Sequence, residues 1–359
     1  MLHVPTVRGN SNTIASLEAE EEIPARWMSV PMGRISKIGS ATPNRGLYLI
    51  GLGLGDPTDI TVKGLAVLRN CSHVYLERYT SVLPSPIREL EDMSGRSITV
   101  ADREMVENHA DGILDKAGRE AVAFLVVGSP LAATTHYDLI LRARKRNVTV
   151  HIIPNASIMT AVSMCGLQLY SFGQPVSIPL FNGNWRPGSF IKRILDNMNR
   201  NLHTLCLLDL KVKEPDLDQL AQGRIVYLPE RFMTASTAAR QILEVVNRTA
   251  REKEEQQQQA RSKRRPWWRI MGRYFRWAES PSTPAQSALA PTTVGPETRA
   301  VALARVGAGD MKIVSGTLAE IANLDLGPPL HSLVILAKEL HPLEQEALLQ
   351  FDIHGAGAL

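Results

Sequence analysis

The chain has 359 residues, of which 44% are hydrophobic and 21% charged, as expected for a soluble globular protein of about two domains. No apolar run reaches the ~18–20 residues of a membrane span, and the first residues lack the basic and apolar segments of a secretory signal. Three distant cysteines, Cys71, Cys165 and Cys206, have neither disulfide-framework nor metal-ligand spacing. They indicate buried free thiols, no metal site and a reducing compartment, by default the cytoplasm.

The net charge of +4 and the pI near 9.0 come from one segment. Residues 250–277 carry nine Lys or Arg and three acids, so the rest of the chain sums to −2. The basic pI therefore does not identify the body of the protein as nucleic-acid binding.

Residues 1–45 lack clear periodicity and are predicted to form a loose extension. From Leu47 an apolar strand runs into a Gly-rich turn that ends at Pro57, and a helix is expected over 58–70. Short strands follow at 74–76 and 97–100, and then a polar, helix-like stretch at 108–117.

The apolar run Val122–Val127 is typical of a central parallel strand covered on both faces. It ends in Gly128-Ser-Pro130, and a helix over 137–145 and a strand over 148–153 follow. Strands that alternate with helices predict a parallel, doubly wound α/β sheet.

The second half has a different pattern, with strands expected at 176–180, 203–210, 300–306 and 332–337 and an amphipathic helix at 236–247. We predict an N-terminal α/β domain over 46–163 and a C-terminal α/β domain over 164–359. A basic, disordered insertion at 250–298 interrupts the second domain. Its aromatic and arginine-rich centre, 266–277, would suit contact with RNA, a membrane surface or a partner protein, or would have no such role.

Two Gly-rich turns follow strands that we expect at the carboxyl edge of the sheet, where parallel sheets bind ligands. The first, Gly51–Pro57, has neither the spacing of the dinucleotide fingerprint nor the Gly-Lys of a phosphate loop. In the second, Ser129 and Pro130 would begin a helix as N-cap and first residue. After the strand at 148–153, Asn155 or Ser157 would cap a helix or contact a ligand.

Read together, twelve ordered motifs resemble those of the eukaryotic diphthine synthases, over roughly residues 46–249 and 298–343. Among them are Leu-Tyr-Leu-Ile-Gly-Leu-Gly-Leu-Gly-Asp, Tyr-Thr-Ser, Ala-Thr-Thr-His and Ala-Arg-Val-Gly. The motifs start at Leu47, Asp59, Tyr79, Ala101, Ala133, Asn155, Gly166, Trp185, His203, Val212, Ala304 and Pro329.

The resemblance implies a tetrapyrrole-methylase-like fold of two α/β domains, with a parallel sheet in the first, a mixed sheet in the second and the cofactor cleft between them. It implies a homodimeric, cytoplasmic methyltransferase that uses S-adenosyl-L-methionine. The implied substrate is the 3-amino-3-carboxypropyl-histidine of translation elongation factor two, methylated in diphthamide biosynthesis. The alternative is a non-catalytic paralogue that binds this factor or the translation apparatus.

By matching positions, the resemblance implies eight cofactor contacts, most of them small or apolar: Leu54, Ser129, Ala132, Ser157, Ile158, Leu208, Val306 and His331. The family usually has Gly-Asp-Pro where this chain has Gly128-Ser-Pro130. Serine lacks a carboxylate that could pair with the cofactor's ammonium, and such a charged hydrogen bond is worth ~1.5–3 kcal/mol.

Methyl transfer from a sulfonium needs placement of the acceptor more than a strong base. His331 is the leading candidate for a catalytic helper, with His136 and Asp209 as further candidates; for each, a purely structural role is the alternative. Arg186, Lys211 and Lys213 would contact the acidic substrate group or would be solvated surface cations.

Overall fold

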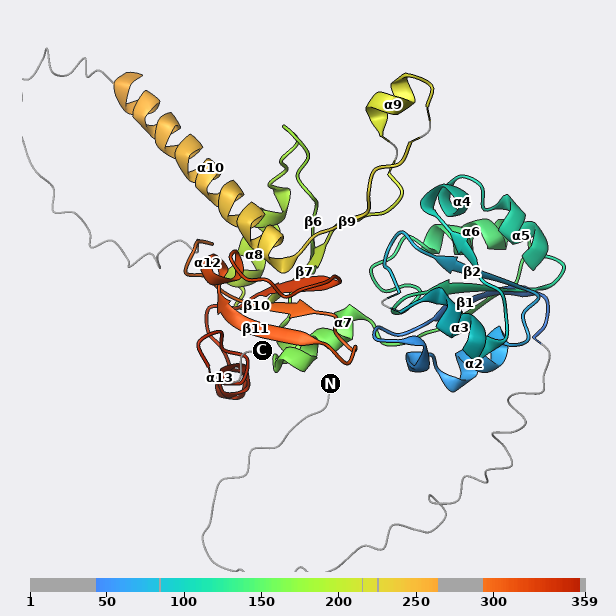
Figure 1. The fold of residues 1–359 in the computed structure, drawn as a ribbon. Helices are drawn as coiled ribbons and strands as arrows, with labels where there is room; N and C mark the ends of the chain where they lie inside the picture. The colour runs from blue at the N-terminus through green and yellow to red at the C-terminus, as the bar shows by residue number, and fades with distance from the viewer. Residues whose placement is uncertain (1–42, 84, 215, 225, 264–292, 356–359) are drawn as a thin grey trace, which may run out of the picture. The chain divides into compact units, whose positions relative to one another are not determined.

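A computed structural model describes residues 43–83, 85–214, 216–224, 226–263 and 293–355. Two five-stranded sheets form the framework, and both belong to one compact unit, Thr42–Leu359 (Figure 1). The predicted extension lies almost wholly outside the described residues, as does most of the predicted insertion.

The first sheet is parallel throughout, with strand order β3-β2-β4-β1-β5. Its strands are β1 (Gly46–Gly51), β2 (His73–Glu77), β3 (Thr99–Ala101), β4 (Ala121–Val126) and β5 (Val150–Ile153). The connecting helices are η3 (Pro57–Asp59), α2 (Val62–Leu68), α3 (Ile87–Ser94), α4 (Arg103–Glu107), α5 (Asp111–Ala117) and α6 (Tyr137–Lys145).

Both faces of this sheet are buried, which explains why its strands are continuously apolar. Leu47 and Leu49 of β1 join one core cluster with residues of α5 and α6. Their neighbours Tyr48 and Ile50 point to the opposite face and pack with residues of α2 and α3. Figure 1 shows these helix pairs on opposite sides of the sheet.

The second sheet is mixed, with order β11-β10-β12-β7-β6; only β6 and β7 pair in parallel. Its strands are β6 (Val176–Ile178), β7 (Thr204–Leu208), β10 (Arg299–Ala304), β11 (Lys312–Thr317) and β12 (His331–Ile335). Its helices are α8 (Ser189–Asn199), α10 (Ala235–Lys263), α12 (Leu318–Ile321) and α13 (Pro342–Leu349). The predicted fold class is confirmed, whereas the domain boundary at 163/164 stays a prediction.

Short elements connect the two sheets and extend the second. The chain passes from β5 to β6 through α7 (Ile158–Ala161), η4 (Val162–Cys165) and η5 (Leu169–Ser171). An excursion after β7 contains the paired β8 (Leu210–Lys211) and β9 (Arg231–Phe232) with α9 (Leu217–Ala221) between them.

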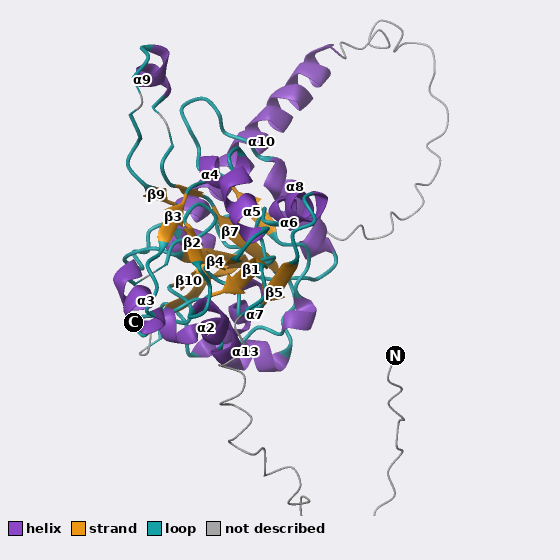
Figure 2. Ribbon diagram, turned by 90° about the vertical axis from the view of Figure 1, so that its right-hand side faces the viewer, coloured by secondary structure: helices purple, strands orange, loops and turns teal. Residues whose placement is uncertain are grey.

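The structure corrects the predicted disorder of the insertion at its start, because residues 250–263 continue α10. The first part of α10 buries Ala238, Ile242 and Val245, and the helix then runs on past the second sheet (Figures 1 and 2). Glu, Gln, Lys and Arg are good helix formers, and extending a helix that is already formed costs little free energy. Propensity therefore continues the helix where packing has ended.

The structure also corrects the helix start predicted at Ser129. Residues 130–136 form turns, and α6 begins only at Tyr137. Ala133 lies in the left-handed region with φ 60°, which interrupts any helix begun at Pro130.

The three cysteines are buried and free, as predicted. Burial raises the pKa of the Cys206 thiol to about 12 and that of Cys165 to about 11. None of the described helices is long and apolar enough to span a membrane.

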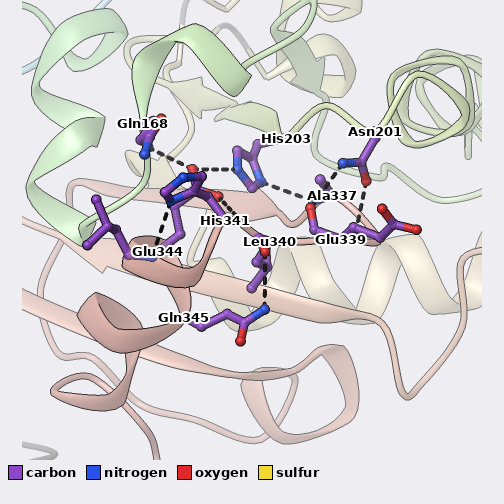
Figure 3. A network of polar contacts seen from close by, with 10 residues as sticks. Gln168, Asn201, His203, Ala337, Glu339, Leu340, His341, Glu344 and Gln345 are labelled. Carbon is purple, nitrogen blue, oxygen red and sulfur yellow. Dashed lines mark hydrogen bonds and ion pairs between the residues drawn. The ribbon is translucent and has the colours of Figure 1, made fainter. Parts of the chain in front are cut away.

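A buried hydrogen-bond network holds α13 against the second sheet (Figure 3). The Glu344 carboxylate, 2% exposed, accepts hydrogen bonds from the N–H groups of Gln168 and His341, at 2.9 and 3.0 Å, and lies 3.2 Å from His203 Nε2. His203 Nδ1 accepts from the Ala337 N–H at 3.0 Å. His203 therefore carries its proton on Nε2 and donates it to Glu344.

Only one of the two partners carries a charge. Burial lowers the pKa of His203, against the hydrogen bond and charge of Glu344. Burial alone would raise the pKa of Glu344, but the hydrogen bonds from Gln168, His341 and His203 outweigh it and lower this pKa. The native network is therefore a neutral imidazole beside a carboxylate anion.

Glu344→Gln should lower the free energy of unfolding by about 1–3 kcal/mol, because the amide has one acceptor oxygen and places its NH₂ against donors. The exposed Glu346→Gln on the same helix is the matched control, and urea denaturation measures both. Equal losses in the two variants would contradict a buried network.

Acid should destabilise the unaltered chain in two stages. A lowered histidine pKa makes the unfolded state bind the proton more tightly, so stability is lost as the pH falls below about 6.5. The lowered pKa of Glu344 adds a second loss below about 4.3. Urea denaturation from about pH 7 down to about pH 3 measures both stages, and a flat profile would contradict the assigned charge states.

Candidate functional site

The candidate site begins where β1 and β4, neighbours in the first sheet, end in the two Gly-rich turns. Gly53 and Gly128 form an antiparallel bridge across these turns. Gly128 N–H donates to the Gly53 carbonyl at 2.6 Å, and Gly53 N–H donates back to the Gly128 carbonyl at 3.3 Å. The turns are thereby fixed to each other at the carboxyl edge of the sheet.

Glycine is required at two places in this arrangement. A Cβ on Gly55 would lie 2.3 Å from the carbonyl oxygen of Gly307, so the loop after β10 presses directly on the first turn. Gly128 has φ +80°, and a Cβ there would lie 3.8 Å from Leu54 and 3.9 Å from Ser157. The absence of that side chain leaves open the space between Leu54 and Ser157.

A pocket with about 940 Å³ of empty space, part of it open to solvent, lies at this edge. Both sheets contribute residues to its lining, and most of them are small or apolar. The lining consists of Leu54, Thr80, Ser81, Val127, Gly128, Ala132, Ala133, Thr134, Ser157, Ile158, Leu207, Leu208, Leu210, Arg305, Val306, Leu330, His331 and Ser332.

Seven of the eight positions predicted from the resemblance line this pocket: Leu54, Ala132, Ser157, Ile158, Leu208, Val306 and His331. The eighth, Ser129, is not among the lining residues. Its hydroxyl oxygen accepts a long hydrogen bond of 3.4 Å from the Asn155 N–H. The fold therefore gathers seven of these positions from distant parts of the chain, while their role in binding a cofactor remains a prediction.

Neither of the proposed caps after β5 uses its side chain to cap a helix. Ser157 occupies the N-cap position of α7 without a side-chain cap bond and lines the pocket instead. The Asn155 amide donates to the carbonyls of Gly51, at 3.0 Å, and Asp59, at 2.9 Å. Asn155 thus holds the first Gly-rich turn in place through hydrogen bonds to main-chain carbonyls.

Arg305, which the sequence analysis did not single out, organises the pocket wall contributed by the second sheet. Its guanidinium, 6% exposed, donates to the Asp310 carboxylate at 2.6 Å and to the Asp310 carbonyl at 2.9 Å. It also donates to the carbonyls of Leu326, at 2.9 Å, and Pro328, at 2.6 Å. One side chain therefore holds the loops before β11 and β12. The available signal was a charged residue at the end of the apolar run 300–304.

His331, the leading candidate for a catalytic helper, has both ring nitrogens engaged. Nδ1 accepts from the N–H of Ala235, the first residue of α10, at 3.2 Å, and Nε2 donates to the Pro328 carbonyl at 2.9 Å. Burial lowers the His331 pKa, and the nearby charge of Arg305 contributes to the same effect. In this arrangement the imidazole is neutral and positions backbone, with no nitrogen free to accept a proton.

The other candidate helpers lie outside the pocket lining. His136 Nδ1 lies 3.1 Å from the Pro130 carbonyl, and its ring packs edge-on against Tyr79 and Phe124. Asp209 accepts from the Leu180 N–H at 2.9 Å. These contacts fit the structural alternative for each of them.

The three cations proposed to contact substrate are all in ion pairs. Arg186 pairs with Glu244 at 2.5 Å, Lys211 pairs with Glu214 at 2.9 Å, and Lys213 pairs with Asp102. None of the three lines the pocket.

The sequence analysis quoted motifs that contain Thr80, Ser81 and Thr134 but did not predict that these three residues line the pocket. Thr80 and Ser81 follow β2 and lie in the Tyr-Thr-Ser motif. A hydroxyl pair directly after a parallel strand was the available signal, because such residues reach the carboxyl edge of the sheet.

The parallel sheet, the mixed sheet and the pocket between their strand ends are the features of a methylase of the tetrapyrrole type. The sequence profile of the Tetrapyrrole (Corrin/Porphyrin) Methylases matches residues 46–252. A solved structure of diphthine synthase superposes with a TM-score of 0.63 at 28% identity and covers 85% of this chain and 95% of that one.

Curated relatives identify a particular family within these methylases. The diphthine methyl ester synthase of Homo sapiens is 49% identical over 86% of this chain and 95% of its own length. That of Saccharomyces cerevisiae is 45% identical over 85% and 89%. The chain belongs to the diphthine methyl ester synthase family and is a methyltransferase.

Arg305→Lys should lower the free energy of unfolding by about 1.5–3 kcal/mol, because one ammonium cannot reach the acceptors that the guanidinium joins. Arg146→Lys is the matched control, since Arg146 pairs with two carboxylates on an exposed surface. That change should cost under about 1 kcal/mol in the same urea denaturation experiment. Similar losses would mean that Arg305 does not organise the loops.

Proposed function

We propose that the chain transfers methyl groups from S-adenosyl-L-methionine to the 3-amino-3-carboxypropyl-histidine of translation elongation factor two, a step of diphthamide biosynthesis. The observation that carries the proposal is the gathering of seven family-matched positions around one pocket at the carboxyl edge of the parallel sheet. The names of the relatives, diphthine methyl ester synthases, support the same reaction. No observation favours the alternative of a non-catalytic paralogue.

The pocket fits an adenosine joined to a methionine chain. Apolar surface for the adenine and the methionine chain comes from Leu54, Ile158, Leu208 and Val306. Small residues let backbone N–H and C=O groups reach the ligand. The open space beside Gly128 favours a ligand that lies against the main chain.

When bound, S-adenosylmethionine supplies an activated methyl group, which the acceptor takes while the sulfur keeps the electron pair of the broken bond. The residues of the chain have to exclude water and hold the acceptor within about 3–3.5 Å and in line. Arg305 and His331 hold the wall of the second sheet in place for this. His331 offers no free nitrogen, so we assign the acceptor's proton to water.

We propose a cytoplasmic homodimer that acts on elongation factor two as its protein partner. The suggested contact of the basic insertion with RNA, a membrane surface or a protein rests on residues 264–292, which lie outside the described part of the chain, and stays a prediction.

Calorimetric titration with S-adenosylhomocysteine should give micromolar affinity. Elongation factor two carrying the aminocarboxypropyl group should accept labelled methyl from S-adenosylmethionine. Because the resemblance implies an aspartate here, Ser129→Asp should tighten S-adenosylhomocysteine binding by roughly 10–100-fold; unchanged affinity would agree with the place of Ser129 outside the pocket lining. Ser72→Asp, an exposed change before β2, is the control. Absence of binding by both the natural chain and Ser129→Asp would overturn the proposed cofactor site.

Gly128→Ala should weaken S-adenosylhomocysteine binding by about tenfold or more, because its methyl group would enter the space between Leu54 and Ser157. Gly223→Ala is the matched control, with a similar φ of +75° and no atom within 4 Å of the added Cβ. Both variants should lose some stability from backbone strain, but only the first should lose affinity. Equal affinities would show that the ligand lies elsewhere.

A further inference from the structure

The pocket contains two threonine hydroxyls at positions that the family resemblance does not assign to the cofactor. Thr80 follows β2, and Thr134 lies in the turns after β4, so both come from the edge of the first sheet. The hydrogen bonds that each hydroxyl makes determine what it can offer a ligand.

The proton of the Thr80 hydroxyl is already used. Oγ1 donates to Glu77 Oε1 at 2.5 Å, and Glu77 is 1% exposed. The other carboxylate oxygen of Glu77 accepts from the N–H groups of Tyr79 and Thr80, each at 3.0 Å. Three hydrogen-bond donors therefore point at the Glu77 carboxylate, which acts only as an acceptor. Thr80 Oγ1 therefore has only lone pairs to offer the pocket.

The hydroxyl proton of Thr134 is also donated within the protein, to a different partner. Its hydroxyl donates to the Pro130 carbonyl at 2.6 Å, which also leaves its oxygen as an acceptor. Two acceptor oxygens in the lining of one pocket, one of them hydrogen-bonded to a buried carboxylate, favour a ligand that brings N–H donors.

We propose that Thr80 and Thr134, with Glu77 behind Thr80, form the subsite for the amino group of the methyl acceptor. The inference rests on the proposed function and specifies its acceptor side. Thr80 and Thr134 receive N–H hydrogen bonds from the amine, while Glu77 acts as a positioning residue that fixes the polarity of Thr80. Each methyl added to the nitrogen removes one donor, so a fully methylated product loses these hydrogen bonds and is released more readily than its precursor.

Thr80→Val tests the subsite, because it keeps the shape of the side chain and removes the acceptor oxygen. We expect kcat/KM for the modified elongation factor to fall by roughly 10–100-fold, the size of a hydrogen bond from a charged donor. Affinity for S-adenosylhomocysteine should stay within about twofold. Thr80→Ser restores the oxygen and should recover most of the activity, whereas Thr99→Val, an exposed change on β3, should alter neither quantity.

Glu77→Gln tests the direction of the Thr80 hydroxyl proton. The amide NH₂ would donate to Thr80 Oγ1 and turn its hydroxyl proton toward the pocket, which reverses the polarity of the subsite. With S-adenosylhomocysteine present, NMR titration with α-aminobutyrate and with butyrate compares the acceptor chain with and without its amine. The natural chain should prefer the amine, and both Thr80→Val and Glu77→Gln should lose that preference.

The outcomes separate the two proposals. Methyl transfer by the natural chain with unchanged kcat/KM in Thr80→Val would overturn the subsite and leave the proposed function standing. Failure of the natural chain to methylate the factor would overturn the proposed function. The titrations would then decide the subsite alone: equal binding of the two probes by the natural chain would overturn it, and a preference for the amine lost in Thr80→Val would support it.

Discussion

The close approach of main chain to main chain at the carboxyl edge of the first sheet is the constraint on which the pocket depends. Gly53 and Gly128 exchange hydrogen bonds across two turns that follow neighbouring parallel strands, and Gly55 lies against Gly307 from the second sheet. Three segments distant in sequence meet without side chains between them. Of these glycines Gly128 lines the pocket, so a ligand beside it can approach the main chain closely, and the strands behind the turns set the positions of the walls.

Buried charged residues hold two of these walls, and also α13 outside the pocket lining, through the backbone. Glu77 accepts from the segment after β2, Arg305 donates to the loops before β11 and β12, and Glu344 fastens α13. A buried charge is costly unless it is fully hydrogen-bonded, and in each case main-chain groups supply most of the partners. Such residues stabilise one loop conformation, since moving the loop would leave the charge without partners.

This arrangement suits a reaction whose methyl donor is already activated. The pocket offers apolar walls, backbone groups and hydroxyls, and its one histidine has both nitrogens bound to the protein. The residues with titratable groups mainly shape the site, and placement of the acceptor supplies the catalytic contribution. Because placement of the acceptor matters most, the direction in which two hydroxyl protons point can decide which acceptor fits.

The sequence by itself determined the fold class and seven of the eighteen positions that line the pocket. Continuous apolar runs indicated a parallel sheet covered on both faces, and the Gly-rich turns indicated its functional edge, because both signals are local and follow strand geometry. Ordered motifs then identified seven lining positions. Tertiary structure alone decided the partners of His331, the role of Arg305 and the polarity of Thr80, since each depends on groups brought close by folding. It also decided where α6 begins and how far α10 extends: the left-handed backbone at Ala133 excludes an earlier start, and helix propensity carries α10 beyond its packed face.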